Sequence, residues 1–156
     1  MITLAKSFLY LFFVTSLALV FIPYFLLANP NFSFGFNLNL FGILPIAVGF
    51  SFLIKSAADF ALTGKGTPAP FNPPKIFVSK GLYRFVRNPM YVGALFALIG
   101  EAILFGSFIL VIYAFVLWLI FHLFVVFYEE PNLRKRFGKR YEEYCKRVAR
   151  WVPRIS

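Results

Sequence analysis

Two long uncharged runs dominate the pattern of hydrophobic and polar positions along this chain. No charged residue lies between Lys6 and Lys55, and Glu101 alone interrupts the run between Arg87 and Glu129. A soluble domain alternates apolar core positions with polar surface positions, whereas a helix that crosses a bilayer needs about 20 consecutive apolar residues. The pattern therefore predicts an all-α fold, a polytopic membrane helix bundle.

Turn-forming residues divide these runs into about four spanning helices. Asparagine, proline and glycine concentrate between residues 29 and 39, and Gly106-Ser107 leaves room only for a tight hairpin. Pro89 suits the first turn of a helix, because its fixed φ fits there and its missing N–H would be unpaired anyway. The predicted spans cover residues 7–27, 40–62, 89–105 and 109–128.

The polar segments complete a single membrane domain, residues 1–156. Its predicted parts are spans one and two at 1–62, a basic loop at 63–88, the helical hairpin of spans three and four at 89–128, and a tail at 129–156. Apolar residues from Leu133 to Val148 recur every three or four positions opposite a face of Lys and Arg. This predicts a C-terminal interfacial amphipathic helix, which Gly138 is expected to kink or divide.

Composition and charge agree with a membrane protein and orient it. Hydrophobic residues make up 60% of the chain and charged residues 14%, against about 45–50% and about 25% in soluble domains. The net charge of +10 comes from basic residues concentrated in the 63–88 loop and the tail. The positive-inside bias places both segments in the cytoplasm, and Lys6 places the N-terminus there too. We expect any active site on that side, built from helix ends and loops.

Other function classes fit the residues less well. One histidine, His122, and one cysteine, Cys145, are too few for a usual zinc site or for an intrachain disulfide. Basic residues that flank spans are explained by the bilayer, so neither nucleic acid nor metal is expected as a partner. The sequence also contains no glycine-rich motif for phosphate or dinucleotide binding.

A few polar residues at membrane depth are candidates for chemistry. Glu129 follows His122 by seven residues, which in a regular helix places the two about 20° apart on one face and roughly 10 Å apart along it. Trp118 lies one turn deeper, which completes a column that leads to the inner surface. A lone helical histidine is also common as a packing residue. Lys55 and Asp59 are spaced to pair, and the wider roles of both and of Glu101 stay open.

Two motifs resemble a known enzyme family. The segment from Gly81 to Gly93 is similar to the G-x-Y-x-x-x-R-(H/N)-P-x-Y-x-G motif of the integral-membrane methyltransferases. The segment from Glu129 to Tyr144 resembles their E-E-x-x-L-x-x-x-F-G-x-x-Y-x-x-Y tail. That family contains isoprenylcysteine carboxyl methyltransferase and the phospholipid N-methyltransferases. Asn88, in place of a histidine, makes the chain most similar to the prokaryotic members.

The resemblance implies transfer of a methyl group from S-adenosylmethionine to a lipid-like acceptor. The first candidate is an isoprenylcysteine-type carboxylate, and the alternative is the amine of a phospholipid or another small amphiphile. Arg87 and Glu130 are implied as catalytic residues, and the tail is expected to close the donor site. The implied donor-binding residues are Asn88, Pro89, Tyr91, Gly93, His122, Glu129 and Tyr141.

Two alternatives from other classes stay open. Membrane reductases of the NADPH-dependent sterol type share a somewhat similar C-terminal helical arrangement, although they generally need more spans. A non-catalytic scaffold whose basic tail binds anionic lipid would carry the same amphipathic pattern.

Overall fold

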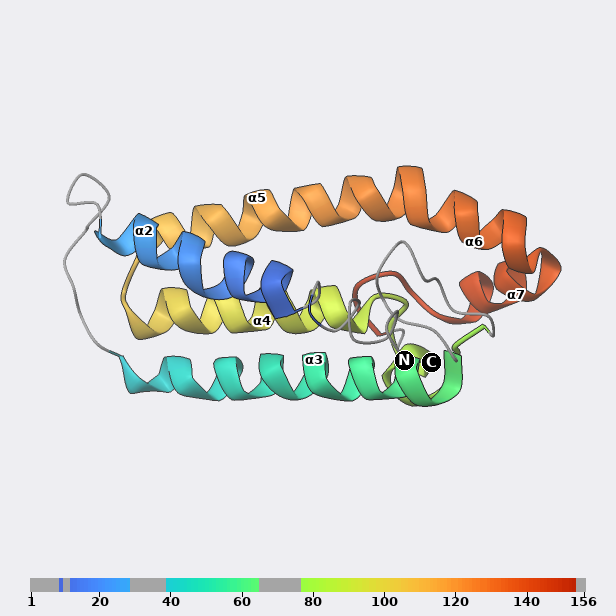
Figure 1. Cartoon of the computed structure of the whole chain (residues 1–156), viewed down its shortest axis with the longest axis horizontal. Coiled ribbons are helices and arrows are strands. Elements are labelled where there is room, and N and C mark those ends of the chain that lie inside the picture. Colours follow the sequence, from blue (N-terminus) through green and yellow to red (C-terminus); the bar gives the residue numbers. More distant parts are fainter. Residues whose placement is uncertain (1–8, 10–11, 29–38, 65–76, 154–156) are drawn as a thin grey trace.

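The computed structural model describes residues 9, 12–28, 39–64 and 77–153, with the backbone alone at 61–64. In these ranges the chain is helical, and extended pairing is limited to one isolated bridge between Val86 and Ala149. The predicted all-α fold is therefore confirmed for the described residues. Helix α4 lies between α3 and α5, with α2 beside α5 (Figure 1).

The helix boundaries follow the predicted ones closely. An N-terminal helix, Phe12–Ala28, contains a π turn at Leu17–Phe21 and ends with α2, Ile22–Ala28. The Asn39 side chain accepts a hydrogen bond from Phe41 N at 3.1 Å, where a short 3-10 turn leads into α3. The remaining helices are α3 Ile43–Gly64, α4 Pro89–Leu104, α5 Phe108–Phe124, α6 Glu130–Phe137 and α7 Lys139–Arg147.

Within the described ranges, two helices are long and apolar enough to cross a membrane, Leu40–Phe60 and Phe108–Phe137. The helices Phe12–Ala28 and Pro89–Leu104 are apolar but shorter. Large apolar side chains on the outer faces of the bundle are exposed, for example Ile54 on α3 and Phe115 on α5. So many exposed large apolar side chains are suited to lipid rather than to water.

Glycines bring α3 and α4 into very close contact. A Cβ added to Gly49 would lie 2.5 Å from Gly93 O, and one added to Gly100 would lie 2.6 Å from Ile46 Cγ1 and 2.7 Å from Gly42 O. Small residues of α3 and α4 therefore let the two backbones approach each other closely. We call this contact, formed by Gly42, Gly49, Gly93 and Gly100, the glycine seam.

The tail folds back on itself after α6. Gly138, with φ of 52°, ends α6 and separates it from α7, as the sequence predicted. The apolar side chains of the tail face protein. Tyr141, Tyr144 and Val148 are buried together, and Phe77 packs against them. The amphipathic pattern is thus confirmed, whereas an interfacial position of this helix stays a prediction. A stripe of apolar residues does not by itself tell lipid from protein.

Candidate active site

The two motifs found in the sequence lie side by side in the structure. The backbone N–H of Arg87 donates to Ala149 O at 2.9 Å, and Asn88 Nδ2 donates to Arg150 O at 3.2 Å. After α7 the chain becomes extended at Val148 and runs back to the start of α4. This return brings Arg150 and the tail against the beginning of α4, more than 60 residues earlier in the chain.

A buried ion-pair network forms at this junction around Glu130. Its side chain is only 5% exposed, and its carboxylate accepts from Arg150 Nε at 2.7 Å and from Arg87 Nη1 at 3.0 Å. Arg134 Nη2 approaches at 3.8 Å from one turn along α6. The hydrogen bond to Glu130 holds the pKa of Arg150 above its ordinary value. Three cations around one carboxylate leave an excess of positive charge.

Arg87 has a nitrogen left to bind something else. Its side chain is 14% exposed, and Nη1 also contacts Cys145 Sγ at 3.1 Å. Its Nε–H is buried and has no hydrogen-bond partner among the described residues. Such a group costs free energy unless a water or a ligand accepts from it, so this nitrogen could donate to an anionic or carbonyl oxygen.

Aromatic rings gather next to the network. Trp151 Nε1 donates to His122 Nδ1 at 3.1 Å, and the two rings stack with their centroids 6.1 Å apart. Tyr91 stacks on Phe121 at 4.5 Å and lies 6.4 Å from Trp151. We call Tyr91, Phe121, His122 and Trp151 the aromatic cluster. Trp118 contacts His122 at 5.5 Å, as the predicted column requires.

Glu129 joins this cluster by a route that helical periodicity did not predict. Glu129 is the last residue of a π turn, Val125–Glu129, which follows His122 in the continuous helix Phe108–Phe137. A π turn inserts one residue into the helical repeat, which rotates the positions beyond it by about 100°. The common face of His122 and Glu129 assumed a regular helix and stays a prediction. Glu129 accepts a hydrogen bond from the Tyr91 side chain, which belongs to the aromatic cluster.

Two of the predicted donor-binding residues, Gly93 and Tyr141, lie outside the aromatic cluster. Gly93 is buried in the glycine seam, where its backbone faces α3. Tyr141 is 2% exposed within the tail, next to Cys145 and Arg87, and burial raises the pKa of its hydroxyl. Trp151 was not predicted as a site residue, because nothing in the spacing of the tail places it against α5.

The predicted pairing of Lys55 with Asp59 is wrong. Across the part of the chain that the structure describes, Lys55 forms no ion pair, and Asp59 Oδ2 accepts from the backbone N–H of Leu82 at 3.2 Å. An i,i+4 spacing allows a pair but does not exclude a stronger partner from another segment.

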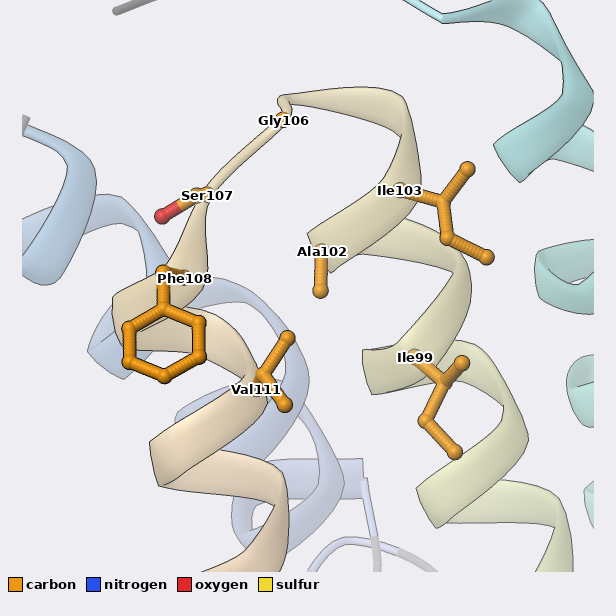
Figure 2. A pocket seen from close by; sticks show the side chains of 7 residues that line it. All are labelled: Ile99, Ala102, Ile103, Gly106, Ser107, Phe108 and Val111. Atoms are coloured by element: carbon orange, nitrogen blue, oxygen red, sulfur yellow. The ribbon is translucent and has the colours of Figure 1, made fainter. Parts of the chain in front are cut away.

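A hollow lies at the other end of the bundle, where α4 turns into α5 (Figure 2). Its volume is about 500 Å³, and its lining includes Ile99, Ala102, Phe108 and Val111. It is lined almost entirely by apolar groups and lies roughly 20 Å along α4 from Arg87, at 1.5 Å per residue. The charged groups that could bind a polar ligand therefore lie at the opposite end of α4.

Comparison with known proteins agrees with the two motifs. A model of the phospholipid methyltransferase family matches residues 38–140, well over half of the chain. The chain belongs to the phospholipid methyltransferase family. This confirms the resemblance identified in the sequence. The matched range contains Arg87, Glu129 and Glu130, and it contains Tyr91, Phe121 and His122 of the aromatic cluster.

The chain also resembles curated proteins that are named as isoprenylcysteine methyltransferases. The chain is 35% identical over 85 residues to protein-S-isoprenylcysteine O-methyltransferase of Schizosaccharomyces pombe, which covers 54% of the chain and 36% of the relative. It is 37% identical over 80 residues to a probable protein-S-isoprenylcysteine O-methyltransferase of Oryza sativa subsp. indica, covering 51% and 41%. It is 35% identical over 80 residues to protein-S-isoprenylcysteine O-methyltransferase B of Arabidopsis thaliana, covering 51% and 40%. Each match thus spans about two fifths of the relative.

Proposed function

We propose that this protein is an integral-membrane methyltransferase that moves a methyl group from S-adenosylmethionine to a lipid-like acceptor. The first candidate acceptor is an isoprenylcysteine-type carboxylate, and the second is the amine of an ethanolamine phospholipid. One observation carries the proposal: the tail returns to the start of α4 and joins an arginine-rich network to an aromatic cluster. The family and the names of the relatives support the same reaction.

The aromatic cluster and Glu129 fit the donor. Tyr91, His122 and Trp151 present stacked rings, which suit an adenine base, and the Glu129 carboxylate suits the ammonium group of the donor. The first backbone N–H groups of α4, after Asn88 and Pro89, lack helical partners and suit its carboxylate. When bound, the sulfonium supplies an activated methyl carbon for an in-line displacement.

The arginine network fits the acceptor. Arg87 offers its unpartnered Nε–H to an anionic oxygen, while Glu130 and Cys145 hold the rest of the guanidinium in place. A carboxylate acceptor attacks through its own oxygen, so no proton has to leave during transfer. An amine acceptor has to lose a proton, for which Glu129 is the candidate base, because Glu130 is held in ion pairs with arginines. The first candidate therefore demands less of these residues.

The proposed topology has four spans with both termini in the cytoplasm. It is supported by two long apolar helices, by the shorter apolar helices Phe12–Ala28 and Pro89–Leu104, and by the basic residues of the loop and tail. In this orientation the polar donor reaches the aromatic cluster from the cytoplasm. The acceptor reaches Arg87 laterally from the lipid, with the tail at 129–156 closing the donor site.

Isothermal titration of the purified protein with S-adenosylmethionine and with NADPH tests the proposal. We expect saturable binding of S-adenosylmethionine and no heat from NADPH. Transfer of a labelled methyl group to a prenylcysteine or an ethanolamine phospholipid then identifies the acceptor. Binding of NADPH alone would support a reductase, and binding of neither ligand would support a scaffold.

A further inference from the structure

The segment that carries Arg87 is held from two sides. On the tail side, the Tyr144 hydroxyl donates to Tyr83 O, and the Arg87 N–H donates to Ala149 O at 2.9 Å. On the other side the partner is the C-terminal part of α3, where Asp59 Oδ2 accepts from Leu82 N at 3.2 Å. The rings of Phe60 and Tyr83 also meet there, with centroids 5.7 Å apart.

Two features of position 81 require glycine, and one of them is its contact with Asp59. The Gly81 φ of 61° lies in the left-handed region, which favours glycine. A Cβ at this position would also overlap the Asp59 carboxylate. The glycine that opens the first motif therefore has a local reason, since it lets the chain turn tightly over an acidic side chain of α3.

We propose that Asp59 is a positioning residue for Arg87, an inference that rests on the proposed function. Asp59 holds the short 3-10 turn Gly81–Arg84 through the backbone of Leu82, five residues before Arg87. A hydrogen bond to an ionised carboxylate is stronger than one to a neutral oxygen, so the charge of Asp59 fixes the turn more firmly than an amide would. The tail holds the same segment through Tyr83 O and the Arg87 N–H, so the backbone that carries the Arg87 guanidinium is fixed from both sides. Asp59 itself contacts neither the aromatic cluster nor the Arg87 side chain in the described contacts.

Hydrogen exchange of the full-length protein in detergent measures this contact without using activity. In Asp59→Ala, amide exchange in peptides covering residues 81–88 should rise about tenfold, while peptides of α4 beyond Tyr91 stay unchanged. Asp59→Asn keeps an acceptor oxygen without the charge and should fall between Ala and wild type. Lys55→Ala, one turn earlier on the exposed face of α3, is the matched control and should match wild type. Unchanged exchange in Asp59→Ala would overturn the inference.

Kinetics separate positioning from general folding. Asp59→Ala should lower turnover about tenfold at saturating acceptor and leave donor affinity within about twofold, with partial rescue in Asp59→Asn. A loss of donor affinity equal to the loss of turnover would contradict positioning. If wild type itself transfers no methyl group to either acceptor, the proposed function fails, whereas the exchange result still decides whether Asp59 holds the turn.

A double-mutant cycle with Gly81→Ala tests the contact directly. In wild type the added methyl group meets both the carboxylate and the unfavourable φ, whereas in an Asp59→Ala background only the unfavourable φ remains. Gly81→Ala should therefore cost less stability in Asp59→Ala than in wild type. Additive effects of the two substitutions on thermal unfolding would argue against the proposed contact.

Discussion

Trp151 donates its indole N–H to Nδ1 of His122 at 3.1 Å, and this bond joins the end of the described tail to the last turn of α5. Because Nδ1 accepts, a neutral His122 carries its proton on Nε2 and presents a donor on its other side. The tail therefore sets the hydrogen-bonding character of a residue on α5. Donor binding and the position of the tail should be linked through this pair.

Trp151→Phe tests that link. The substitution keeps an aromatic ring and removes one hydrogen bond, worth about 1 kcal/mol, so affinity for S-adenosylmethionine should fall about fivefold in isothermal titration. His122→Ala and Glu129→Gln should each weaken binding at least as much. Trp118→Phe removes an indole N–H for which the structure gives no hydrogen bond, and it should change affinity less than twofold. Equal losses in Trp118→Phe and Trp151→Phe would contradict the role of the bond.

Arg87→Lys should lower turnover at least about tenfold, or about 1.4 kcal/mol of barrier, with little change in donor affinity. Lysine keeps the charge but lacks the planar fork that contacts Glu130 and the acceptor oxygen together. The rates are measured with prenylcysteine and phospholipid acceptors at saturating donor. Arg84→Lys, an exposed position three residues earlier, is the control. Wild-type rates in Arg87→Lys would reduce its role to a lipid anchor.

Glu130→Gln should destabilise the protein strongly. It removes the negative charge that Arg87 and Arg150 share, and breaking a buried ion pair on one side costs about 3–5 kcal/mol. Thermal unfolding in detergent should shift down by roughly 10 °C. Arg134→Ala removes a partner that is 55% exposed and 3.8 Å away, so its shift should stay small. Similar shifts in both variants would mean that the network is not buried in solution.

Gly49→Ala should also lower thermal stability, by about 1–3 kcal/mol. The sign of the change is informative, because Gly→Ala in an open helix stabilises by about 1 kcal/mol. At this position the new methyl group would lie 2.5 Å from Gly93 O and 2.6 Å from Ala97 N, both backbone atoms. Ser51→Ala, exposed on the same helix, serves as the reference. A stabilised Gly49→Ala would exclude the glycine seam.

Single cysteines at Ser33 and Ser79, in a Cys145→Ser background, test the proposed orientation. Position 33 lies outside the described residues, and position 79 precedes the turn at Gly81. Serine at 145 retains an acceptor for Arg87 Nη1, so the site should survive the background substitution. With a reagent that does not cross the membrane, intact cells should label the Ser33 position and not the Ser79 position. The reverse pattern would invert the topology and place the donor site outside.

Local signals in the sequence were sufficient for the helices and insufficient for the contacts between them. Pro89, Gly106 and Gly138 mark the ends of elements by their backbone preferences, so those boundaries were predicted closely. The π turn that ends at Glu129 has no such marker, so the sequence did not predict this departure from a regular helix.

Partners far apart in the sequence were harder to predict. The motifs indicated that Arg87 and Glu130 belong to one site, and the ion pair at 3.0 Å brings them together. The choice of Leu82 over Lys55 as the partner of Asp59 depends on how α3 meets a distant loop. Periodicity within one helix carries no information of that kind.

The glycine seam also determines how the site responds to the thickness of the surrounding bilayer. Gly42 meets Gly100 and Gly49 meets Gly93, so α3 cannot slide along α4 without driving side chains into backbone. Asp59 lies ten residues beyond Gly49, roughly 15 Å further along α3. A shorter or longer lipid chain can tilt the bundle or draw its flanking residues toward the headgroups, but it leaves these internal distances unchanged. If turnover changes with the chain length of the surrounding lipid, the change would then reflect how the acceptor reaches Arg87. It would not reflect a change in the geometry of the site.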